Sequence, residues 1–192
     1  WPQTYFLDFP AQIKGIGVTP IGLLIFTKHK TWLVTGSGPL TLSQQILTGS
    51  LGCVNGDTVV NIQGAAYWVS TDGVCVSNGG AVKVLTRDKL VKEYFKIDTT
   101  VNAVSYDEQY YLHFSDDNRT LVVDLERQSI REASYGIESL ITTGDFLYGY
   151  SEGKLHNLEQ AGFTNLHYKY TSPKFIGAGY TVPKTYKNIY VK

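Results

Sequence analysis

The chain has 192 residues and a formal net charge of zero, from 17 basic and 17 acidic residues with no run of like charge. Its aromatic content of 13%, its 19 glycines and its charged content of only 18% are typical of a β-rich domain with many turns. The balanced charge argues against tight nucleic-acid binding, and no apolar stretch has the length of a membrane span. We therefore expect an all-β protein with no tight nucleic-acid binding and no membrane insertion.

The cysteines and the first residue give two further expectations. Cys53 and Cys75 are too few for a disulfide framework in a chain of this length, so we expect both to be buried as small apolar residues. Position 1 is Trp, and the sequence contains no Met. This composition predicts an excised domain or a processed product.

Four hairpin patterns follow one another along the chain. Each consists of two short apolar, partly alternating runs joined by a polar or glycine-containing turn. The turns are expected at residues 28–30, 71–73, 116–119 and 151–153. They lie about 35 to 45 residues apart, which is the interval expected of β-propeller blades. Tight hairpins need left-handed backbone angles, so we expect a positive φ for at least two of Gly73, Gly79 and Gly153.

Each hairpin is flanked by two more candidate strands. Those before the hairpins span 13–18, 58–62, 101–106 and 137–143, and those after them span 42–47, 81–85, 129–133 and 165–170. Four short antiparallel strands per repeat form a propeller blade, which buries its faces against neighbouring blades. The sequence thus predicts a β-propeller-like fold with four to five blades of four antiparallel strands.

Two segments depart from the repeat. Residues 86–95 place Leu90 and Tyr94 four positions apart among charged residues, which predicts one short helix inserted between the second and third blades. Residues 171–192 contain Pro173 and Pro183 and an alternating "YKNIYV" segment. We assign residues 1–170 to the propeller domain and 171–192 to a closing strand or the start of the next domain.

No cluster of residues has the spacing that metal binding or catalysis requires. The four histidines, His29, His113, His156 and His167, fall in different repeats. Asp116-Asp117-Asn118 lacks the Gly and Glu of a calcium loop and is typical of a turn. Carboxylates at or near turns, as a glycosidase would need, do not define a pair; these are Asp57, Asp72, Asp107, Asp145 and Glu152. We predict no enzyme, no catalytic residue, no cofactor and no metal site.

An ordered set of motifs covers residues 20–95. It comprises "LLIFT" at 23–27, "WLVTG" at 32–36, "GPLT" at 38–41, "GC" at 52–53 and the longer "YWVSTDGVCVSNGG" at 67–80. This order resembles the propeller region of bacteriophage tail proteins of the hub or nozzle (tail tubular protein B-like) type. The segment "TSPKF" at 171–175 is similar to the one with which that region passes to a tail-assembly domain.

The resemblance implies a structural component of the virion tail, assembled in the host cytoplasm and taking part in tail assembly, host attachment and the DNA-ejection conduit. Its implied partners are other tail proteins, and the intact protein is expected to form a ring-type homo-oligomer. The ring-forming domains of that family are not represented in this stretch, so the sequence favours a monomer for the isolated chain.

Two other functions stay open at this stage. A glycan- or host-surface-binding propeller is one, because aromatic residues stack on sugars; the candidates are Tyr5, Trp32, Tyr67, Trp68, Tyr110, Tyr148 and Tyr150. A glycoside hydrolase is the other, and it requires a pair of carboxylates in a concave site.

Overall fold

The computed structural model describes residues 6–87, 89–90, 95, 101–127, 129–143 and 145–159, together with the backbone of 167–170. All strand pairs in this part of the chain are antiparallel. The same residues contain no α-helix, and Gly56–Thr58 form a short 3-10 turn. The all-β class predicted from the sequence is confirmed.

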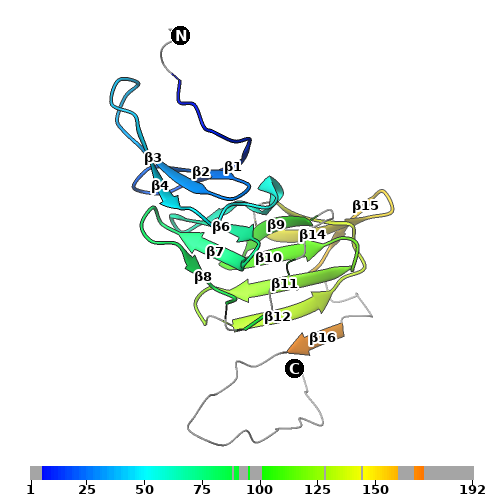
Figure 1. Ribbon diagram of the computed structural model, residues 1–192. Coiled ribbons are helices and arrows are strands. Elements are labelled where there is room, and N and C mark those ends of the chain that lie inside the picture. Colours follow the sequence, from blue (N-terminus) through cyan, green and yellow to red (C-terminus); the bar gives the residue numbers. More distant parts are fainter. Residues whose placement is uncertain are drawn as a thin grey trace, which may run out of the picture.

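Four sheets follow one another in chain order (Figure 1). The first sheet contains β1 (Ile13–Val18), β2 (Leu23–Thr27), β3 (Thr31–Thr35) and β4 (Ser43–Thr48). The second contains β5 (Val60–Ile62), β6 (Ala65–Ser70), β7 (Gly73–Ser77) and β8 (Lys83–Val84). The third contains β9 (Val101–Tyr106), β10 (Gln109–Phe114), β11 (Arg119–Asp124), β12 (Ser129–Ser134) and β16 (His167–Tyr170), and the fourth contains β13 (Ser139–Thr143), β14 (Phe146–Ser151) and β15 (Lys154–Asn157).

The four predicted hairpins are confirmed, and they occupy equivalent places. Each joins the second strand of its sheet to the third, as β2–β3, β6–β7, β10–β11 and β14–β15. The φ angles of Gly73, Gly79 and Gly153 are +131°, +101° and +75°, so all three adopt the backbone expected of them. The turns therefore recur as architecture, with no residue identity in common.

One strand has a different partner from the one predicted. β16 pairs with β12 at the edge of the third sheet, so the prediction that residues 165–170 complete the fourth sheet is wrong. An alternating sequence predicts a strand but does not identify its neighbour. The fourth sheet has three strands within the described residues.

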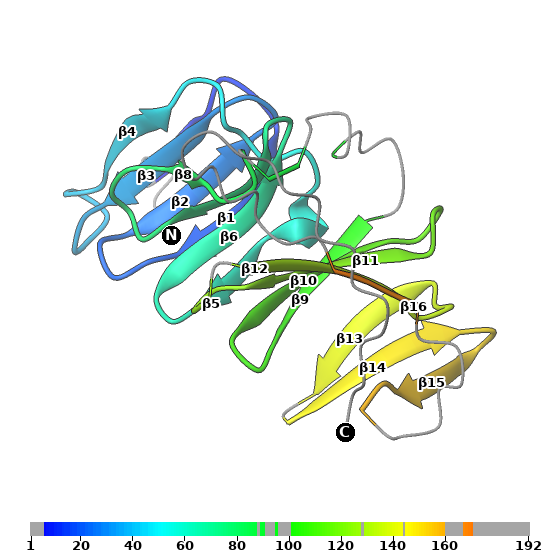
Figure 2. The ribbon, with the colours of Figure 1, turned by 90° about the horizontal axis from the view of Figure 1, so that it is seen from below.

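Two predictions fall largely outside the described residues. Of the expected helix at 86–95, the structure describes a turn in which the amides of Lys89 and Leu90 donate to the carbonyl of Thr86, both at 3.0 Å, and it describes Phe95, which is buried. The segment 171–192 lies beyond the described part of the chain. In Figure 2 the first sheet, in blue, and the fourth, in yellow, lie at opposite ends of a row of sheets.

The core consists of three clusters, and each joins consecutive sheets. The first and second sheets meet through Leu24, Phe26, Leu33, Trp68 and Cys75. The second and third meet through Val69, Val74, Leu112 and Val123, and the third and fourth through Tyr111, Val122, Leu140 and Leu147. The second and third sheets therefore contribute side chains to two clusters each, whereas the first and fourth contribute to one.

The first strands of consecutive sheets also contact one another, as β1 with β5, β5 with β9 and β9 with β13. Asparagine side chains form hydrogen bonds across two of these strand-to-strand contacts. Asn61 Oδ1 accepts from the amide of Val18 at 2.8 Å. Asn102 Oδ1 accepts from the amide of Leu140 at 3.2 Å, and its Nδ2 donates to the Leu140 carbonyl at 2.7 Å. One type of sheet-to-sheet step is thus repeated along the row.

Candidate interaction surfaces

The outer face of the first sheet is apolar. One cross-strand row on this face pairs Ile16 with Ile25, Ile25 with Trp32, and Trp32 with Ile46. A second row pairs Val18 with Leu23, Leu23 with Val34, and Val34 with Gln44. Directly paired positions project to the same side of a sheet. We call these eight residues the N-terminal end face; they carry no charge and one amide.

Much of the N-terminal end face is open to solvent. Ile16, Val18 and Ile46 are 52%, 54% and 51% exposed. The segment before β1 covers part of the face, because Phe9 packs edge-on against Trp32 with the ring centroids 5.8 Å apart. Gln44 Nε2 also donates to the carbonyl of Asp8, at 3.3 Å. The opposite face of the same strands is buried against the second sheet, so the exposed apolar side chains lack a comparable neighbour among the described residues.

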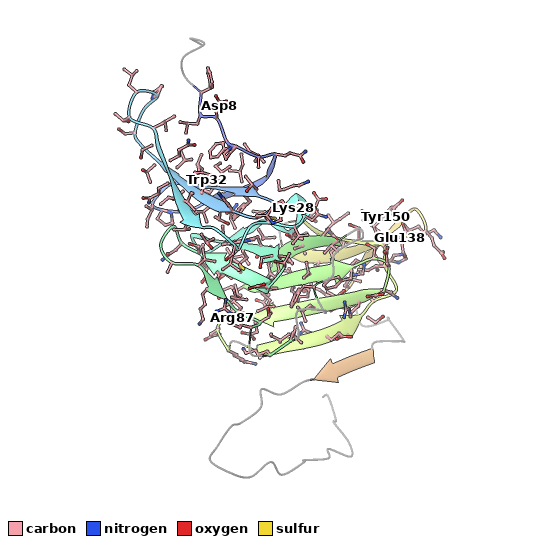
Figure 3. The ribbon with its side chains drawn as sticks, viewed as in Figure 1. Asp8, Lys28, Trp32, Arg87, Glu138 and Tyr150 are labelled. Carbon is pink, nitrogen blue, oxygen red and sulfur yellow. The ribbon has the colours of Figure 1, made fainter. Side chains whose placement is uncertain are left out.

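The outer face of the fourth sheet combines apolar and aromatic residues with three uncharged polar ones, Ser139, Thr143 and Asn157. Its rows pair Ile141 with Tyr148 and Tyr148 with Asn157, Ser139 with Tyr150 and Tyr150 with Leu155, and Thr143 with Phe146. We call these eight residues the C-terminal end face. Phe146 and Leu155 are 49% and 60% exposed. Figure 3 shows Tyr150 at the end of the molecule away from Trp32.

A pocket of about 350 Å³ lies at the second and third sheets, remote from both end faces. Its lining includes Tyr67, Lys83, Lys89 and Asp124. Burial raises the pKa of Tyr67. Within its lining there is no carboxylate pair and no nucleophile beside a base, which are the combinations that hydrolysis would need.

The histidine and turn residues singled out from the sequence have structural partners. His113 is fully buried, with Nδ1 2.9 Å from Thr120 Oγ1 and Nε2 3.0 Å from the carbonyl of Ile137. Desolvation lowers the pKa of His113, which favours the neutral ring. Asn118 has a φ of +47° and accepts from the amide of Ile137 at 3.2 Å, so it forms the turn and fixes the start of the fourth sheet. No group of three or more His, Cys, Asp or Glu side chains in the described part of the chain is placed to hold a metal.

The candidate carboxylates are divided between the two ends of the strands. Asp72 and Glu152 lie in turns between second and third strands, whereas Asp107 and Asp145 lie between first and second strands. Consecutive antiparallel turns alternate between the ends of a sheet, which separates these two pairs. Asp57 lies in the 3-10 turn before β5.

The candidate sugar-stacking aromatics lie in different surroundings, and Tyr67 is the one that lines the pocket. Trp68 and Tyr110 are fully buried, and the Tyr110 hydroxyl donates to the carbonyl of Thr58 at 2.8 Å. These two rings are part of the core and are closed to a ligand. Trp32, Tyr148 and Tyr150 belong to the end faces, while Tyr5 lies outside the described residues. Three of the candidate aromatics thus lie on the same end faces as the exposed aliphatic residues.

Comparison with known proteins assigns no family to the chain. No protein-family model matches it, and no curated protein matches it. No helix among the described residues has the length and apolar character needed to cross a membrane. The surface features described above are two sheet faces with no charged residue in their paired rows and a pocket of about 350 Å³.

Proposed function

We propose that the chain is a structural, propeller-type domain of a bacteriophage virion tail, of the hub or nozzle type, which contributes to tail assembly and the DNA-ejection conduit. The observation that carries the proposal is the row of sheets whose two outer faces carry exposed apolar side chains in the described part of the chain. Exposed apolar faces of this kind mark surfaces that pack against other protein. The order of motifs over residues 20–95 supports placing this packing domain in a tail.

The repeated sheet-to-sheet step supports a propeller-like arrangement. In a propeller, the first strand of each blade lies nearest the central axis, and consecutive blades cover each other's faces. The contacts of β1 with β5, β5 with β9 and β9 with β13 are those expected of innermost strands. The zero net charge also suits a conduit, since a wall that passes DNA must not retain the phosphate backbone. Other tail proteins are the proposed partners, and the intact protein would form a ring.

Localisation in virions tests this function directly. Antibodies raised against the purified chain should label the tail when virions of the encoding phage are viewed by immunogold electron microscopy. Mass spectrometry of the same purified virions should recover peptides of this chain. Label on the capsid alone, or virions without these peptides, would rule the function out.

A glycan-binding propeller is the second candidate, favoured by the exposed aromatics of the C-terminal end face. Phe146 and Tyr148 have ring centroids 6.2 Å apart, and Tyr150, which is 37% exposed, lies on the same face. Adjacent rings of this kind present a surface on which sugars can stack. Binding to a glycan array that is lost in a Tyr150→Ala variant would support this candidate, and an array without binding would remove it.

A further inference from the structure

We propose that the N-terminal end face of one copy binds the C-terminal end face of a second copy, so that two rows of four sheets close into one ring of eight. This pairing goes beyond the proposed tail function and does not depend on it. The sequence alone favours a monomer, and the pairing is the alternative that the exposed side chains of the two end faces support.

The pairing continues a step that the chain already makes three times. At each of the three inner interfaces, one sheet packs against the next sheet in the chain. The C-terminal end face is the side that the next sheet would cover, and the N-terminal end face is the side that a preceding sheet would cover. The fourth sheet of one copy therefore meets the first sheet of another as one sheet meets the next within the chain.

The end faces share with the inner interfaces a mixture of aliphatic and aromatic residues, and they add four uncharged polar residues, Gln44, Ser139, Thr143 and Asn157. The inner contact between the first and second sheets combines aliphatic residues with Phe26 and Trp68, whose ring centroids are 4.6 Å apart. The proposed contact combines mainly aliphatic residues on one side with Phe146, Tyr148 and Tyr150 on the other. Neither face carries a charged residue in its paired rows, so the contact buries no ionised group.

The strands of the first sheet have the sequence of strands that are covered on both sides. The run Leu23–Thr27 is apolar at consecutive positions, as is Tyr110–Phe114 in the third sheet apart from its buried histidine. The β10 run is buried on both faces by the second and fourth sheets. A continuous apolar run is typical of a strand with neighbours on both faces. In β2 the four residues from Leu24 to Thr27 are already buried, while Leu23 is 42% exposed. A second copy would therefore cover Leu23 together with the exposed side chains of the neighbouring strands.

Symmetry favours a ring that contains two copies of the chain. A contact between two different faces produces either a closed ring or an open filament. In a ring of two copies, both N-terminal end faces are paired with both C-terminal end faces. Such a ring has eight sheets, which is the upper limit of the usual four to eight blades. A ring closed in this way leaves no apolar sheet face for a further copy, so a dimer is expected and filaments are not.

Sedimentation velocity between about 1 and 100 µM tests the pairing. The wild-type chain should sediment as a dimer. Val18→Glu places a charge on one end face and Leu155→Glu on the other. Each should raise the dissociation constant by at least about 30-fold and leave the variant monomeric over this range. Leu40→Glu is the matched control: Leu40 is 84% exposed in the loop between β3 and β4, so this variant should remain dimeric. Circular dichroism identifies any variant that fails to fold.

Mixing the variants distinguishes this pairing from a contact between identical faces. Val18→Glu retains an intact C-terminal end face, and Leu155→Glu retains an intact N-terminal one. An equimolar mixture should therefore associate through one intact junction, although each variant alone is monomeric. A wild-type monomer at about 100 µM, a Leu155→Glu variant that stays fully dimeric, or a mixture no heavier than its components would each overturn the proposal. A monomeric chain that still localises to tails would leave the proposed function in place.

Discussion

At the scale of single residues, burial rather than chemistry explains the groups that first attract attention. Cys53 and Cys75 are free and have no exposed surface, as the sequence predicts for small apolar residues. Burial raises the pKa of the Cys53 thiol to about 11 and that of Cys75 to about 12. Because the thiolate is the reactive form, both side chains are inert packing groups at neutral pH.

Thiol labelling checks this assignment. In the native protein at neutral pH we expect neither cysteine to react with a thiol reagent within the time in which a small exposed thiol reacts fully. Both should react once the chain is unfolded in denaturant. A Leu40→Cys variant gives the positive control, since position 40 is 84% exposed. Rapid labelling of either native cysteine in the folded wild-type chain would contradict the burial.

His113 makes a pH-dependent contribution to stability. Its Nε2 carries the proton, because the carbonyl of Ile137 can only accept, and the Thr120 hydroxyl then donates to Nδ1. The lowered pKa means that the unfolded chain binds a proton more readily than the folded one. This contribution is complete above the unfolded pKa and is lost as the pH falls toward the folded pKa.

We therefore expect the free energy of unfolding of the wild type to decrease between about pH 7.5 and 5.5. His113→Asn should cost about 2–3 kcal/mol at the higher pH, through the lost bonds and packing. It should also show a smaller decrease across the same interval. Urea unfolding of both proteins at the two pH values measures the difference, and equal decreases would show that His113 does not titrate as described.

At the scale of the elements, the hairpin glycines differ in what surrounds them. Gly73 and Gly153 both have positive φ, in turns that occupy equivalent positions in their sheets. A Cβ at Gly73 would overlap the Thr86 hydroxyl, which accepts from the amide of Val74 at 3.1 Å. A Cβ at Gly153 has nothing within 4 Å. The two positions thus separate backbone strain from steric overlap.

Alanine at these two glycines should give different losses of stability. Gly153→Ala carries only the left-handed backbone penalty and should cost about 1 kcal/mol. Gly73→Ala adds the overlap and the broken bond between Thr86 and Val74, and should cost about 3 kcal/mol. Chemical denaturation of both variants measures the pair. Equal losses would mean that Thr86 moves aside without cost.

The sequence predicts the elements well where local patterns define them. β1 and β9 have the predicted bounds, and the turn between β2 and β3 falls at the predicted residues 28–30, because short apolar or alternating runs end at marked turns. The partner of β16 was not predictable, because an alternating run of residues can pair with an edge strand of either the third or the fourth sheet. The open end faces were also hidden in the sequence. Only the pairing registers show which side chains share the outer face of the first and the fourth sheet.

At the scale of the whole molecule, the row of sheets has three filled interfaces and two open ends. If a second copy covers those ends, folding and association are linked, because the dimer is folded and the unfolded chains are separate. The midpoint of thermal unfolding then depends on protein concentration. A tenfold increase in concentration adds about 1.4 kcal/mol to the stability of the dimer, and for two chains of this size it should raise the midpoint by about 2 °C.

Differential scanning calorimetry across a hundredfold range of concentration would then show a rise of about 4 °C for the wild type and for Leu40→Glu. Val18→Glu and Leu155→Glu should each unfold at a lower midpoint that does not change with concentration, because each has lost one face of every junction. The dependence on concentration separates association from simple stability, since a charge that only weakened the fold would lower the midpoint equally at all concentrations. A wild-type midpoint that is constant across this range would show that each copy folds as a row with its apolar ends open to water.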